Sequence, residues 1–104
     1  MINSHDQAIR KFTSDAKRIL RDNVIDILIY GSVARGEAKK ESDIDVIVIV
    51  KRNAFKMQMR LAALSFDILL ETGEYISVQT LKSKELKRDT IFLHNVKRDA
   101  IHAL

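Results

Sequence analysis

The 104-residue chain has no cysteine, no proline and only three glycines. Without cysteine it can form neither a disulfide framework nor a thiolate metal site, and this composition suits a reducing compartment. No apolar run approaches the length of a membrane span, and residues 1–6 lack the apolar core of a secretory signal. We therefore expect a cytoplasmic protein without a membrane partner, folded as a single domain over residues 1–104.

The net charge is +4, and it comes from lysines and arginines that are scattered among acidic residues. This balance suits a phosphate-bearing ligand or an acidic partner. Because the basic residues form no long run, most of them are expected to be solvated surface. Nucleic acid is compatible with the charge but is not favoured.

Periodicity predicts an α/β (α+β) fold with a small mixed sheet of about three strands flanked by helices. Short runs rich in β-branched residues indicate strands at 24–30, 44–50 and 75–81. Apolar residues at helical spacing indicate a first helix from residue 4 to about 22, which would cover one face of the sheet. A polar turn or loop is expected at 82–89, followed by a final helix with Phe92, Val96 and Ala100 facing inward.

A further helix, expected over residues 54–70, carries more apolar residues than one sheet face requires. Its apolar positions fall on two stripes, namely Phe55, Met59, Ala62 and Phe66 on one, and Met57, Leu61, Leu64 and Ile68 on the other. Packing on one face of a sheet needs a single stripe. Either the stripe that is not needed for packing on the sheet is an exposed surface that binds another chain, or the helix is central and buried on both sides.

Asp43 and Asp45 lie where the second strand begins. Side chains alternate along a strand, so both carboxylates project to the same face, roughly 7 Å apart along it. Two such carboxylates repel each other unless a cation lies between them. Hard oxygen ligands suit Mg²⁺ or Mn²⁺, which accept substrate phosphate oxygens as further ligands. The alternative is an exposed strand with two solvated aspartates.

Gly31 and Ser32 follow the first strand. Gly31 stands where the backbone turns sharply or approaches a ligand closely. Ser32 occupies an N-cap position, so its hydroxyl and the free N–H groups after it could hold phosphate oxygens, although an ordinary strand-to-helix turn has the same form. The turn can share a ligand with Asp43 and Asp45 only if the first two strands are antiparallel, which is therefore predicted.

Together these residues resemble a known signature. The string Gly31-Ser32-x-Ala34-Arg35-Gly36, five residues, then Ser42-Asp43-x-Asp45 resembles that of the polymerase-β-type nucleotidyltransferases, and in this fuller form their minimal nucleotidyltransferase branch. The resemblance implies that fold, with Asp43 and Asp45 as catalytic ligands of Mg²⁺ or Mn²⁺ and Gly31 and Ser32 as ligands of ATP phosphates. Arg35 would contact phosphate, or brace the loop by pairing with Glu37 or Asp43.

The resemblance also implies a reaction: transfer of a nucleoside monophosphate, AMP from ATP, to an acceptor hydroxyl as pyrophosphate leaves. Small members of this branch are often paired with a HEPN-type helical toxin, and some attach AMP to a tyrosine of that toxin and so act as its antitoxin. The alternative is a nucleotide-binding protein with weak chemistry that neutralises its partner by forming a complex.

A third carboxylate, from a later strand, is usual in active members. Ser77 stands where we expect that acid, while Asp67, Glu71 and Glu74 are close in sequence but lie on the helix or at the start of the strand. A third acid commonly helps to bind the metal and activate the attacking hydroxyl. Its absence therefore bears more on turnover than on nucleotide binding.

The histidines and tyrosines are expected to be structural. His5, His94 and His102 have no ligand-like spacing, and we expect them in surface or capping roles on helices. Tyr30 and Tyr75 are expected to pack on strands.

Overall fold

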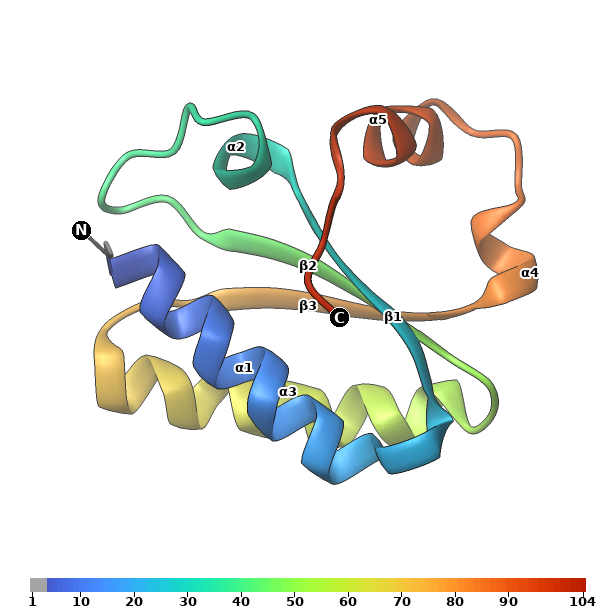
Figure 1. Ribbon diagram of the computed structural model, residues 1–104, viewed down its shortest axis with the longest axis horizontal. Helices are drawn as coiled ribbons and strands as arrows, with labels where there is room; N and C mark the ends of the chain where they lie inside the picture. The colour runs from blue at the N-terminus through green and yellow to red at the C-terminus, as the bar shows by residue number, and fades with distance from the viewer. Residues whose placement is uncertain (1–3) are drawn as a thin grey trace.

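A computed structural model describes residues 4–104 and confirms the α/β class. The elements are, in chain order, α1 (Ser4–Leu20), a 3₁₀ turn η1 (Arg21–Asn23), β1 (Val24–Tyr30), α2 (Gly31–Ala34), β2 (Ile44–Val50), α3 (Ala54–Thr72), β3 (Ile76–Lys82), α4 (Ser83–Leu86), α5 (Ile91–Asp99) and β4 (Ile101–His102) (Figure 1). The polar stretch 82–89 thus holds the single helical turn α4.

The strands form one mixed sheet in the order β3-β2-β1-β4. β1 and β2 are antiparallel, as predicted, with Tyr30 opposite Asp45, whereas β2 and β3 are parallel. The fourth strand was not predicted. It pairs with β1 through Ile101 and His102 alone, and two residues are too few to show an alternating pattern.

Helices cover both faces of the sheet (Figure 1). α1 and α3 lie on one face, where Phe12, Leu61 and Ile68 pack against β1 and β2. α5 covers the other face, where Leu93 and Val96 join Leu28, Ile47 and other strand residues in a second apolar cluster. Because both faces of β2 are covered, its apolar run is nearly continuous. Within residues 4–104, no helix is long and apolar enough to cross a bilayer.

α5 is rotated from the orientation that we expected. Leu93 and Val96 are buried, whereas Phe92 is 45% exposed, so the prediction of an inward-facing Phe92 is wrong. The Thr90 hydroxyl accepts a hydrogen bond from the Leu93 N–H at 3.1 Å and caps the helix. Phe92 instead meets the ring of Tyr30 edge-on, with ring centroids 5.6 Å apart.

The two stripes of α3 have different environments. Met57, Leu61, Leu64 and Ile68 are buried against the sheet and α1. Phe55, Met59 and Phe66 remain 81%, 60% and 57% exposed. The stripe that contains Phe55, Met59 and Phe66 is therefore an exposed surface, and the alternative of a helix buried on both sides is wrong.

Asn23 links the start of β1 to the end of β2, and its removal is expected to destabilise the fold. Its buried side chain donates to the Arg52 carbonyl at 3.0 Å and accepts from the N–H groups of Lys51 and Arg52 at 3.2 and 3.0 Å. Leaving such groups unpaired costs about 1–3 kcal/mol. For Asn23→Ala we expect Tm to fall by roughly 4–8 °C per kcal/mol in thermal unfolding. Asn95→Ala, on the exposed side of α5, is the control, and equal Tm values for the two variants would contradict the prediction.

Candidate active site

The first part of the candidate site is the bend between β1 and α2. Since Tyr30 is opposite Asp45 in the antiparallel pair, the next residue, Gly31, lies beside the start of β2. Gly31 has φ +74°, a left-handed conformation that favours glycine. A Cβ atom at this position would overlap the Asp45 carboxylate. Glycine is thus required twice here, for the conformation and for the space, and the predicted closeness of bend and aspartate is confirmed.

Asp43 and Asp45 bring two interacting negative charges to the start of β2. Asp45 is half-buried, on the face that also carries Ile47, while Asp43 is exposed just before the strand. Burial, and secondly the charge of Asp43, raise the pKa of the Asp45 carboxyl, while Arg35 acts in the opposite direction. The site is therefore short of positive charge, which a bound cation would supply.

Two carboxylates with open positions fit a magnesium or manganese ion. Within residues 4–104, no cluster of three or more acidic, histidine or cysteine side chains could hold a metal. An Mg²⁺ ion is commonly bound by one or two carboxylates, with waters and substrate phosphates completing its octahedron. The donor set of Asp43 and Asp45, with its unfavourable ligand-free charge, suits such a shared ion.

Ser77 occupies the place of a third acid. In the parallel pair of β2 and β3 it is directly opposite Asp45, as its position in the sequence led us to expect. The acids nearby in sequence lie elsewhere. Asp67 and Glu71 line a groove between α1 and α3, and Glu74 is buried beside His5.

The turn α2 presents backbone groups next to the aspartates. Its internal bonds run from the Arg35 N–H to the Gly31 carbonyl at 3.1 Å and from the Glu37 N–H to the Ser32 carbonyl at 2.9 Å. In the described chain, Tyr30 is the N-cap residue of this turn and gives it no side-chain cap, while Ser32 is its second residue, so the prediction of Ser32 at the N-cap is wrong. The first N–H groups of a helical turn have no partner inside it, so they and the Ser32 hydroxyl could bind an anion.

Arg35 braces the loop. Its Nε donates to Glu37 at 3.4 Å, one of the two carboxylates that the sequence suggested. Its Nη1 also lies 3.6 Å from Asp99 of α5, a contact that the sequence did not suggest. Arg98, and more weakly Arg35, lower the pKa of the Asp99 carboxyl. The Arg35 charge also acts on Asp45, and a contact of Arg35 with phosphate stays a prediction.

His5 and Glu74 form a buried pair that sequence reasoning missed. Both are buried, and His5 Nδ1 lies 3.0 Å from Glu74 Oε2. His5 Nε2 lies 2.9 Å from the Lys39 carbonyl, in the connector that leads to Asp43. The expectation of a surface or cap role is therefore wrong for His5. His102 lies in β4 rather than on a helix, where it pairs with Asp26 at 2.6 Å.

Tyr30 lies beside Asp45 across the β1–β2 pair. Burial, and then the charge of Asp45, raise the pKa of its phenol, so Tyr30 stays protonated at neutral pH. With its edge-on contact to Phe92, this agrees with the expected packing role. Tyr75 precedes β3 and is 43% exposed, so the expectation that it packs on a strand is wrong.

A family comparison decides how this arrangement is classified. The family model described as a nucleotidyltransferase domain matches residues 9–101. The chain belongs to the nucleotidyltransferase domain family. A relative of this nucleotidyltransferase domain is the predicted protein adenylyltransferase MJ0141 of Methanocaldococcus jannaschii, which is 40% identical over 45 residues. That match covers 43% of the chain and 46% of the relative, so it spans about half of the relative's length.

Solved structures share the fold of this nucleotidyltransferase domain. A predicted minimal nucleotidyltransferase superposes with a TM-score of 0.63 at 22% identity, over 96% of this chain and 95% of its own. A chain of a toxin–antitoxin structure with AMP-PNP superposes with a TM-score of 0.60 at 15% identity, over 97% of this chain and 72% of its own. At these identities the likeness shows the fold alone, and it confirms the nucleotidyltransferase fold expected from the sequence.

Proposed function

We propose that this nucleotidyltransferase domain transfers AMP from ATP to a protein hydroxyl in a reaction that requires Mg²⁺ or Mn²⁺. The observation that carries the proposal is the close approach of Gly31 to the Asp45 carboxylate, since it brings the bend that would bind phosphate next to the aspartates that would bind metal. Two comparisons support the choice of reaction. One relative is named as a predicted protein adenylyltransferase, and one protein of the same fold was crystallised with AMP-PNP.

The reaction follows from the charges of the site. The acceptor oxygen forms a bond to the α-phosphorus, the bond to the β-phosphate oxygen breaks, and pyrophosphate leaves while the hydroxyl gives up its proton. Asp43 and Asp45 would hold the metal, which when bound neutralises charge on the phosphate oxygens. The N–H groups after Gly31 and the Ser32 hydroxyl would fix the phosphate tail, and Arg35 adds positive charge beside it.

We further propose that the acceptor is a tyrosine of a HEPN-type helical toxin, so that the domain acts as an antitoxin. Support comes from the toxin–antitoxin complex that shares its fold and from the resemblance of the site motif to the minimal nucleotidyltransferases. Such a reaction would take place in the cytoplasm, and that location stays a prediction.

Incubation with α-labelled ATP tests the proposal. The wild-type chain is mixed with labelled ATP and Mg²⁺ or Mn²⁺, with and without the protein encoded beside it, and labelled protein is separated from free nucleotide. We expect label on the partner, and γ-labelled ATP should leave none because pyrophosphate departs. If neither metal supports labelling with the partner present, the proposed transfer is wrong.

A second candidate function is binding without efficient turnover, and Ser77 is the observation that favours it. The residue directly opposite Asp45 cannot act as a metal ligand or base as a carboxylate would. A protein of this kind would bind ATP and neutralise its partner by forming a complex. Complex formation without label transfer, unchanged in Asp43→Ala and Asp45→Ala, would identify this function.

Substitution of Ser77 by aspartate should distinguish a weakened enzyme from a binder. We expect Ser77→Asp to raise the transfer rate by roughly tenfold or more, since a positioned acid or base contributes about 10²–10⁴-fold where the geometry is right. The added charge should also lower Tm without metal, and Mg²⁺ should restore it. Ser77→Asn is the neutral control. Equal rates for the two variants would show that a carboxylate opposite Asp45 has no role in transfer.

A further inference from the structure

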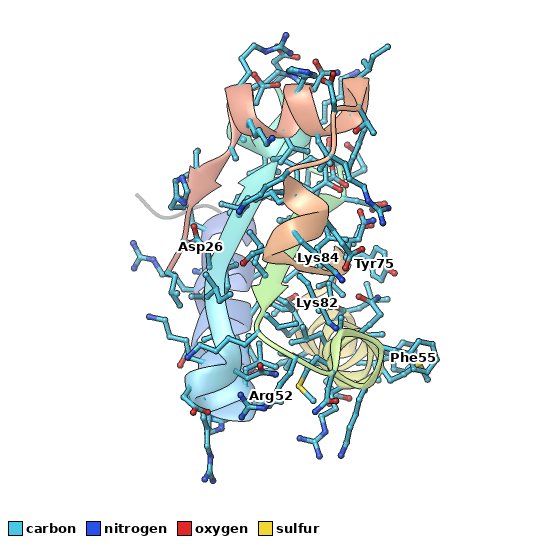
Figure 2. The ribbon with its side chains drawn as sticks, turned by 90° about the vertical axis from the view of Figure 1, so that its right-hand side faces the viewer. Asp26, Arg52, Phe55, Tyr75, Lys82 and Lys84 are labelled. Atoms are coloured by element: carbon cyan, nitrogen blue, oxygen red, sulfur yellow. The ribbon has the colours of Figure 1, made fainter. Side chains whose placement is uncertain are left out.

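The proposed reaction leaves the exposed apolar stripe of α3 unused. It comprises Phe55, Met59, Ala62, Ala63, Phe66 and Leu70, here named the α3 ridge, all exposed. Phe55 and Leu70 at its two ends are 81% and 73% exposed. Figure 2 shows Phe55 pointing outward from α3, away from the rest of the domain.

The α3 ridge is large enough to form an interface. An aromatic side chain offers roughly 150–250 Å², so Phe55 and Phe66 with Met59 and Leu70 make a patch of several hundred Å². Apolar patches of about this size on monomers are often functional. Two such patches, with the polar side chains around them, approach the lower limit of specific interfaces, about 1,200 Å² in total.

The order of residues along the α3 ridge indicates its partner. The ridge has a centre of symmetry between Ala62 and Ala63, about which Met59 corresponds to Phe66 and Phe55 to Leu70. If a second α3 helix lies antiparallel across this centre, each large side chain meets a large one and each alanine meets an alanine. Small residues at the crossing let two helices approach closely. We propose that the α3 ridge is a two-fold interface between two copies of this chain.

The charges beside the α3 ridge favour the same arrangement. Arg60, Asp67 and Glu71 line the groove between α3 and α1, and Lys56, four residues before Arg60, is exposed on the same flank of α3. Glu71 also lies 3.3 Å from Lys11 of α1. A two-fold axis between antiparallel helices places this flank against the same flank of the partner. Along the helix axis, Lys56 then lies midway between the partner's Asp67 and the partner's Glu71. It is two residues, or about 3 Å, from each of them at 1.5 Å per residue. A parallel two-fold pair would instead place this flank against the opposite flank of the partner helix, where Gln58 and Leu69 carry no charge.

The proposed interface leaves the candidate active site open. α3 packs on the face of the sheet that carries Val46 and Val48, whereas Asp45 projects to the face covered by α5. A dimer formed through the α3 ridge therefore presents two accessible sites. A ridge that served only a different protein would need neither the central symmetry nor charges that match under antiparallel pairing.

Sedimentation measurements test the dimer directly. The wild-type chain alone should show a dimer at micromolar concentrations, and Phe66→Asp should raise the dissociation constant at least about tenfold, since few interface residues carry most of the affinity. Ile91→Asp is the matched control, because Ile91 is 82% exposed on α5, away from the ridge. A wild-type chain that stays monomeric at high micromolar concentration would overturn the proposal, and so would equal effects of the two substitutions.

A charge exchange tests the antiparallel geometry. Variant one carries Lys56→Glu and Arg60→Glu, and variant two carries Asp67→Lys and Glu71→Lys, so these four α3 residues carry a single sign in each variant. Each variant alone should lose dimers, while an equimolar mixture should form heterodimers. Circular dichroism confirms folding, and Lys84→Glu with Lys87→Glu on the exposed surface near α4 is the control for changed charge. Failure of the mixture to associate would overturn the antiparallel interface.

Discussion

Replacing Gly31 with valine is expected to lower label transfer by roughly 100-fold or more, because a shift of about 1 Å in a catalytic group can cost that much. The new side chain would start where the Asp45 carboxylate now lies. It would also have to adopt φ +74°, which costs a residue other than glycine about 1–3 kcal/mol. Asp45 must move, and the proposed metal-binding pair loses its relation to the proposed phosphate-binding bend. The measurement is the initial rate of transfer from α-labelled ATP, with Tm determined in parallel.

Gly73→Ala separates the loss of stability from the loss of the site. Gly73 has φ +79° and ends α3, but a Cβ atom there would meet nothing within 4 Å. The control therefore carries backbone strain without a collision. We expect Gly73→Ala to lower Tm and keep most of the transfer rate, whereas Gly31→Val should lower both Tm and the transfer rate. Equal rates in the two variants would show that the contact between Gly31 and Asp45 has no part in the reaction.

Much of the site could be predicted because its residues are close in sequence. β1 and β2 are connected through α2 and a short polar segment, and a connection of this kind suits antiparallel neighbours. The alternation of side chains then placed Asp43 and Asp45 on one face. A ligand held by both the bend and the aspartates required Gly31 to lie beside Asp45, and Gly31 does lie there.

The supporting contacts could not be predicted, since they join residues that only the tertiary fold brings together. His5 contacts the Lys39 carbonyl across 34 positions of the chain. Arg35 reaches Asp99 on the last helix, and nothing in the local pattern around either residue indicates the pair. The rotation of α5 was missed for a related reason. Phe92 and Leu93 are adjacent apolar residues, and either of them can share a helix face with Val96. Periodicity alone therefore did not decide which of the two faces inward.

The sequence of α3 left two interpretations of its second apolar stripe open. Two apolar stripes suit a helix between two layers as well as a surface helix that binds another protein. The structure decides between them because α1 and the sheet together cover only the stripe of Leu61 and Ile68. The order of residues in the exposed stripe is symmetric about Ala62 and Ala63, and this symmetry supports the proposed dimer.

Asp45→Asn should have opposite effects on stability and on function. Burial and the charge of Asp43 raise the pKa of Asp45 above its unfolded value, so its ionised form destabilises the fold, and this penalty disappears as the pH falls through the raised pKa. At neutral pH without metal, Asp45→Asn should therefore be the more stable, by at most about 1 kcal/mol for a partly exposed group.

This gain in stability should disappear when metal and nucleotide are added. With Mg²⁺ and ATP, wild-type Tm should rise because ligand binding stabilises the folded state, while Asp45→Asn should respond little and lose label transfer by roughly 1,000-fold, about 4 kcal/mol. The measurement is Tm at neutral and acid pH, with and without ligands, and the difference between the two proteins without ligands should vanish at acid pH. Asp22→Asn, exposed at the far end of β1, is the control. An unchanged response to Mg²⁺ and ATP in Asp45→Asn would remove Asp45 from the metal site.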